Sequence, residues 1–225
     1  MKELPGRRTP TSKVFQLADG RTEAELSSDP IHFQASNGTL RPIDTTVKAS
    51  RASGFSLANE SNSFRSFFGT RVDELVKFDL GGHGMTLGMA TTKALTPSAA
   101  GDTVTCPDMF GDADLVYQVG PDQLKESIAL ESAPAGPTYR FSLKPTGVKA
   151  VEQSDGSIAF HPASGFPRPP AGSELTGQAL GATDRLQRGD ALDLCIAARR
   201  VTRWRIAIGW RAVRSLGAAV PADEA

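Results

Sequence analysis

The clearest strand pattern in the chain is TCPDMFGDADLVYQVGPDQLKESIAL, residues 105–130. Two runs in it alternate apolar and polar residues, which is the two-residue period of a half-buried β-strand. Between the runs, Gly120–Gln123 supplies the glycine, proline and aspartate that favour a turn. The positions that share the apolar faces of the two arms are Leu115, Tyr117, Val119, Leu124, Ile128 and Leu130. The stretch therefore predicts an entry loop followed by an antiparallel β-hairpin.

Strand and turn patterns of the same kind recur over residues 13–163. Asn37-Gly38 is a strong hairpin-turn dipeptide, and short alternating runs surround it. Residues 1–12 contain prolines and arginines without periodicity, so we expect a disordered leader there. The predicted fold class is all-β, an antiparallel sandwich-like domain with short strands and hairpins over residues 13–163. Its expected core contains Leu115, Tyr117, Val119, Ile128, Leu130, Tyr139, Phe141 and Leu143.

Composition narrows the function classes. The 225 residues have a formal net charge of +0, so the chain has no overall basic field for nucleic acid. No apolar run reaches the length of a membrane span, and the N-terminal residues include no signal-peptide core. As written, the chain is expected to be cytoplasmic. Its two cysteines, Cys106 and Cys195, are too few for a disulfide framework, and we favour no bridge between them.

The composition changes near His161. Lysine disappears, and arginine, alanine and glycine dominate residues 164–225. We interpret this atypical tail, expected to be partly helical or disordered, as out-of-frame sequence. The alternative is a linker followed by an amphipathic helix over 191–216. If the tail is selected, its interleaved basic and aromatic residues suit nucleic acid or an anionic membrane surface; these are Arg203, Trp204, Arg205, Trp210 and Arg211.

No catalytic, cofactor-binding or metal-binding set is predicted. Asp108, Asp112 and Asp114 lie close together, but their spacing does not match a calcium loop, and a polar turn is favoured. Gly81–Gly84 is interpreted as a hairpin turn, because no nucleophile motif accompanies it. The three histidines stand apart from one another in the sequence and are interpreted as surface or strand residues; they are His32, His83 and His161.

Glu126 lies on the apolar face of the second arm, so its carboxylate must be solvated or paired. The favoured interpretation is a structural ion pair with Arg140 or Lys144. The alternative is a general acid, which requires a second carboxylate within roughly 5 to 10 Å. Three further residues are candidates for a sugar-binding platform, although core packing is favoured for them; they are Phe64, Phe67 and Phe68.

Residues 13–163 resemble the N-terminal β-rich region of secreted, wall-associated proteins with RHS (YD) repeats, many of them polymorphic toxins of GC-rich Gram-positive bacteria. The resemblance rests on the pattern PDMF…DLVYQV…LKESIAL within 107–130 and on PIHF…GTLRPID within 30–44. Leu40 stands where the family often has Trp, Phe33 where it often has Tyr, and Cys106 where it often has Tyr. Residues 164–225 show neither the repeats nor the toxin domain that the resemblance leads us to expect after the β-rich region.

The resemblance implies a non-enzymatic structural or display module, here a truncated fragment, with no catalytic residues and no cofactor. Its implied partners are cell-wall glycan or the downstream repeats of its parent protein, and its implied location is secreted or wall-associated. One alternative function is a carbohydrate- or cell-wall-binding β-sandwich module. A second alternative is a carbohydrate-active enzyme that uses Glu126.

Overall fold

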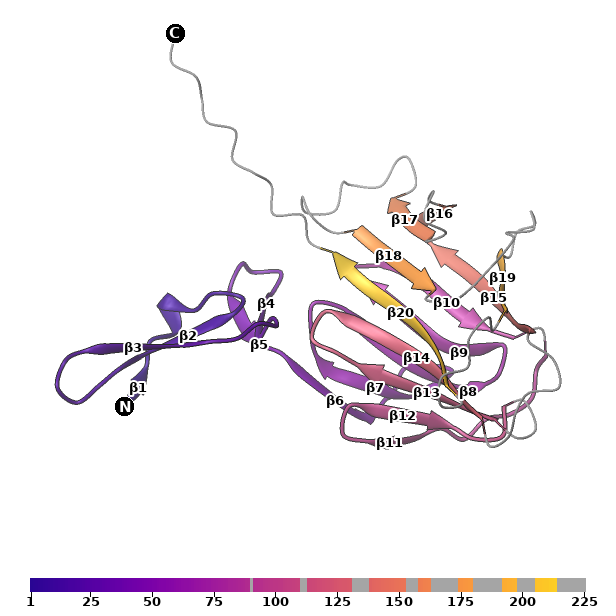
Figure 1. Ribbon diagram of the computed structural model, residues 1–225, viewed down its shortest axis with the longest axis horizontal. Helices are drawn as coiled ribbons and strands as arrows, with labels where there is room; N and C mark the ends of the chain where they lie inside the picture. The colour runs from indigo at the N-terminus through magenta and orange to yellow at the C-terminus, as the bar shows by residue number, and fades with distance from the viewer. Residues whose placement is uncertain are drawn as a thin grey trace, which may run out of the picture.

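The computed structural model describes residues 1–89, 91–109, 113–130, 138–152, 158–162, 174–179, 192–197 and 205–213. These residues form antiparallel β-sheets, and they include no α-helix. The predicted all-β fold class is therefore confirmed. Two large sheets make a sandwich, and two small sheets at the N-terminus project to one side of it (Figure 1).

The N-terminal part is ordered where we expected a disordered leader. A three-stranded sheet has the order β1–β2–β3, and a hairpin of β4 and β5 follows it. The bounds are β1 Lys2–Glu3, η1 (a 3-10 turn) Pro5–Arg7, β2 Ser12–Gln16, β3 Thr22–Leu26, β4 His32–Gln34 and β5 Leu40–Pro42. The leader is held because the Leu4 N–H donates to the Val14 carbonyl at 2.8 Å and because Arg8 pairs with Glu3 at 2.7 Å. These contacts involve backbone and charged groups, and hydrophobic periodicity does not reveal them.

The first large sheet has seven strands in the order β19–β15–β10–β9–β8–β7–β6. Their bounds are β6 Asp44–Ala49, β7 Phe55–Ser61, β8 Arg65–Arg71, β9 Glu74–Leu80, β10 His83–Gly88, β15 Thr138–Thr146 and β19 Leu192–Ala197. From β6 to β10 the order in space follows the order in sequence, as expected when tight turns join neighbouring strands. Strand β15 then pairs with β10 and covers that edge.

The second large sheet has eight strands in the order β11–β12–β13–β14–β20–β18–β17–β16. Their bounds are β11 Ser98–Ala100, β12 Thr103–Cys106, β13 Ala113–Val119, β14 Gln123–Leu130, β16 Val148–Glu152, β17 Ile158–Pro162, β18 Glu174–Ala179 and β20 Arg205–Val213. Strands β13 and β14 are the predicted hairpin, with Leu115 opposite Ile128 and Val119 opposite Leu124. That prediction is confirmed.

The alternative of an amphipathic helix over 191–216 is contradicted at the residues of that range that the structure describes. Residues Leu192–Ala197 and Arg205–Val213 are strands, and each pairs with a large sheet. Strand β20 lies between β14 and β18, so it joins the hairpin to the last three strands of its sheet. A strand edge offers unpaired backbone groups that a neighbouring segment can satisfy, and this tertiary pairing outweighs a helical pattern in the sequence.

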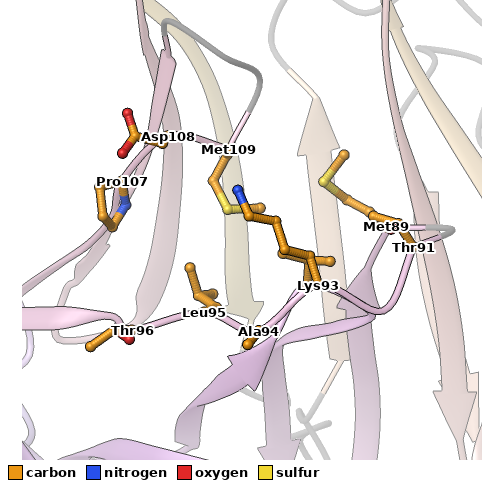
Figure 2. Close-up of a pocket in the computed structure, with 10 residues that line it drawn as sticks. Met89, Thr91, Lys93, Ala94, Leu95, Thr96, Pro107, Asp108 and Met109 are labelled. Atoms are coloured by element: carbon orange, nitrogen blue, oxygen red, sulfur yellow. The ribbon is translucent and has the colours of Figure 1, made fainter.

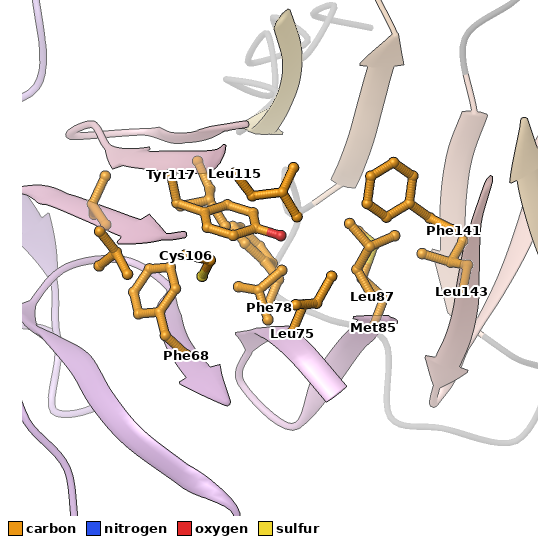
Figure 3. Close-up of a cluster of buried hydrophobic side chains, with 14 of the residues drawn as sticks. Phe68, Leu75, Phe78, Met85, Leu87, Cys106, Leu115, Tyr117, Phe141 and Leu143 are labelled. Atoms are coloured by element: carbon orange, nitrogen blue, oxygen red, sulfur yellow. The ribbon is translucent and has the colours of Figure 1, made fainter. Parts of the chain in front are cut away.

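The core fills the space between the two large sheets. Phe68 on β8 and Tyr117 on β13 meet across it with ring centroids 5.6 Å apart and ring planes tilted by 51°, and Figure 3 shows the two rings close together. Six of the predicted core residues are buried and are therefore confirmed; they are Leu115, Tyr117, Val119, Ile128, Phe141 and Leu143. The side chains of Leu130 and Tyr139 lie outside the described residues.

Candidate functional site

Glu126 is an acidic residue buried in the core of the sandwich. It lies in the middle of β14 between Leu124 and Ile128, and like them it is 0% exposed. On β13 its cross-strand neighbour is Tyr117. Desolvation raises the pKa of the Glu126 carboxyl from 4.5 to about 8, and the Tyr117 hydroxyl offsets part of that rise. The carboxyl is therefore mostly protonated at neutral pH.

Tyr117 and Glu126 are close without forming a hydrogen bond within 3.5 Å. Among the described residues, neither the Tyr117 hydroxyl nor either oxygen of Glu126 has a hydrogen-bond partner. The influence of the hydroxyl on the carboxyl pKa therefore acts over a longer distance than a well-formed hydrogen bond. Burying two polar groups without hydrogen-bond partners lowers the stability of the folded state.

Cys106 is a third acid group on the same inner face. The thiol is free and buried. Desolvation, and then the charges of Glu126 and Asp114, raise its pKa to about 12. Desolvation also raises the pKa of Tyr117 well above its ordinary value, with further contributions from Glu126 and Cys106. The three groups therefore keep their protons near neutral pH, and Cys106 is not activated as a nucleophile.

The predicted ion pair between Glu126 and Lys144 is wrong. Leu143 points into the core, so the two-residue period of β15 turns Lys144 to the outer surface, where it is exposed. The side chain of Arg140, the other predicted partner, lies outside the described residues. Within the described part of the chain, Glu126 has no ion-pair partner.

The burial of Glu126 also bears on a catalytic role. Glycoside hydrolysis needs two carboxyl groups on either side of a sugar that reaches them from solvent. Glu126 is the one buried carboxyl among the described side chains, and no part of it is exposed. A sugar in solvent therefore does not contact it in this structure.

A surface pocket of about 210 Å³ lies between the segment before β11 and the segment after β12 (Figure 2). Its apolar lining residues include Val72, Leu95 and Met109, and its charged lining residues are Lys93 and Asp108. The volume is below the roughly 300–1,000 Å³ of pockets that enclose drug-sized ligands. Lys93 and Asp108 form no ion pair within the described residues. The pocket can hold a small group and is too small to enclose an oligosaccharide.

The aspartate loop behaves as a polar turn where it is described. The Asp108 N–H donates to the Asp114 carboxylate at 3.1 Å, and Asp108 has a positive φ of 54°. Asp112 lies outside the described residues. Within the described residues, no three histidine, cysteine or acidic side chains gather as metal ligands.

The predicted turn at Gly81–Gly84 is confirmed, because it joins β9 to β10 with a φ of 65° at Gly81 and 87° at Gly82. The histidines lie on separate strands. The Nδ1 of His32 lies 2.9 Å from the Thr9 carbonyl, and the Nδ1 of His83 lies 3.2 Å from the Gly147 carbonyl. The side chain of His161 lies outside the described residues.

The three candidate aromatic residues separate into two groups. Phe64 and Phe68 are buried in the core, as the favoured interpretation expected. Phe67 lies on the outer face of β8 and is partly exposed. The Arg65 guanidinium carbon is 5.2 Å from its ring centroid, and the Lys77 ammonium is 5.7 Å from it. Phe67 is therefore the one member of the three that a ligand could reach.

The tail residues proposed to contact an anionic surface are only partly placed. The backbone of Arg205–Val213 forms β20, whereas Arg203 and Trp204 lie outside the described residues. Among the described residues there is no helix of a length and apolarity suited to crossing a membrane.

Comparison with known proteins identified no matching family model, no matching curated protein and no matching solved structure.

Proposed function

We propose that the chain is a non-enzymatic structural module of a secreted, wall-associated protein of the RHS type. One observation carries the proposal: a small sheet projects from the sandwich, and its edge strand β3 is exposed along its whole length. An exposed, projecting strand is suited to attachment. The motif resemblance of residues 107–130 and 30–44 supports the same role and supplies the wall-associated context.

A substrate panel tests the proposal directly. The full chain is incubated with glycan, ester and peptide substrates beside the Glu126→Gln variant, whose fold is checked by circular dichroism. We expect no turnover by either protein. Turnover by the wild type that is lost in a folded Glu126→Gln variant would overturn the proposal and favour a carbohydrate-active enzyme.

A second candidate function is glycan binding, and Phe67 is the observation that favours it. A partly exposed ring beside Arg65 and Lys77 offers an apolar surface next to two cations. Anionic wall polymers combine sugar rings with negative charge, so they match that surface. The test is co-sedimentation with purified peptidoglycan that retains its anionic polymers. Binding should fall in Phe67→Ala and persist in the control Thr86→Ala, which changes another residue on the outer face of the same sheet.

A further inference from the structure

Strand β3 forms a bare edge of the N-terminal sheet. The sheet order is β1–β2–β3, so β3 has a partner on one side only. All five residues of Thr22–Leu26 are exposed, and Leu26 is 79% exposed. Figure 1 shows this sheet extending away from the sandwich. Exposed edges of this kind are templates for strand addition unless the protein blocks them.

The backbone of β3 has hydrogen-bonding groups available at that edge. Lys13 lies opposite Glu25 and Phe15 opposite Glu23. At the two ends of the same register, the Leu17 N–H donates to the Arg21 carbonyl, and the Ser27 N–H donates to the Thr11 carbonyl, each at 2.8 Å. In an antiparallel pair the bonded positions alternate, so Glu23 and Glu25 bond to β2. The N–H and C=O groups of Thr22, Ala24 and Leu26 therefore point outward.

The side chains of β3 indicate which strand could be added. Glu23 and Glu25 share one face, and neither forms an ion pair within the described residues. Ala24 and Leu26 share the other face. A second copy of β3 paired about Ala24 would place Glu23 opposite Glu25 of the other copy, and like charges directly opposite are destabilising. The edge therefore disfavours self-pairing and favours a basic partner.

We propose that β3 binds an extended basic segment of another protein as an added antiparallel strand. The segment alternates lysine or arginine with apolar residues. Its basic side chains lie opposite Glu23 and Glu25, and its apolar side chains cover Ala24 and Leu26. Main-chain hydrogen bonds supply affinity, and the alternate side chains supply specificity. The inference rests on the proposed function, because it names the partner that the projecting sheet would attach.

The test uses a blocked peptide of alternating lysine and valine, long enough to span β3, and measures binding to the full chain by fluorescence anisotropy. Ala24→Pro removes an outward N–H without removing a bond to β2, so affinity should fall by at least about tenfold. The matched control is Ala99→Pro, which alters an exposed alanine of another edge strand, β11. The Ala99→Pro variant should bind the peptide with the same affinity as the wild type.

A charge exchange gives a second, independent readout. The double variant Glu23→Lys/Glu25→Lys should no longer bind the lysine–valine peptide and should instead bind a glutamate–valine peptide. Binding that survives both Ala24→Pro and the charge exchange, or no binding by the folded wild type, would overturn the proposal. Dimerisation of the wild type that Ala24→Pro abolishes would also overturn it, because the occupant would then be a second copy. Each failure is distinct from failure of the proposed function, which the substrate panel decides.

Discussion

Replacing Glu126 by glutamine should stabilise the protein, by an amount that depends on pH. The folded state holds the carboxyl proton up to a pKa of about 8, whereas the unfolded chain releases it near 4.5. Between those values the unfolded state binds fewer protons, so the free energy of unfolding falls as pH rises. Each pKa unit corresponds to about 1.36 kcal/mol, so the carboxyl lowers stability by up to about 5 kcal/mol at pH 8. Below pH 4.5 it has no such effect.

In the Glu126→Gln variant, the glutamine side chain is close in size to that of glutamic acid and cannot ionise. The difference in unfolding free energy between variant and wild type should therefore grow from near zero at pH 4.5 towards about 5 kcal/mol at pH 8. Urea denaturation measured at several pH values gives this difference directly, and the contributions of other titrating groups cancel in it. The control is Glu25→Gln, which changes an exposed glutamate and should leave the pH profile unchanged.

The shape of the difference curve decides whether this reasoning holds. If wild type and Glu126→Gln show parallel profiles from pH 4.5 to 8, the carboxyl does not carry a raised pKa. A wild type that grows more stable as pH rises, relative to the variant, would mean that the carboxylate is paired in the folded state. Either result would refute the description of Glu126 as a buried, unpaired acid.

The remaining predictions concern packing, thiol chemistry and the tail. Phe141→Ala should cost about 3–5 kcal/mol in unfolding free energy, because it empties a 0% exposed site, whereas Leu26→Ala should change the urea midpoint little. Cys106 should resist thiol reagents at pH 8 in the native state and react once urea unfolds the chain; rapid native labelling would contradict its burial. Deleting residues 164–225 removes β20, so the edge of β14 should be uncovered and the midpoint should fall. An unchanged midpoint with better solubility would instead support the out-of-frame interpretation of the tail.

The parts of the fold that the sequence predicts are those set by neighbouring residues. The β13–β14 hairpin follows from alternation and from the turn at Gly120–Gln123, and both features are local. The pairing of β20 with β14 joins segments that are distant in sequence, and the leader pairs with β2 although it shows no alternation of its own. Periodicity carries no information about either partner. For this reason the sequence predicted neither the strands of the leader nor the strands described within residues 164–225.

Local sequence pattern likewise predicts only part of the candidate site. The period of β14 predicts that Glu126 faces inward, as it does. The same period on β15, with Phe141 and Leu143 expected in the core, places Lys144 on the outer face, so the pattern itself argues against the ion pair with Lys144. The absence of a hydrogen bond between Glu126 and Tyr117 depends on the spacing of facing side chains. That spacing is a property of the packed sandwich.

The place of β14 in its sheet has a consequence for how the chain acquires its structure. Its first partner, β13, precedes it by a short turn, but its second partner, β20, is synthesised long afterwards. During that interval the outer edge of β14 is open in the nascent chain. Closing such a long loop carries an entropic cost that is met only when the last contacts form. The seven-residue register between β14 and β20 should therefore form late, and the chain should be most vulnerable to misassembly just before it does.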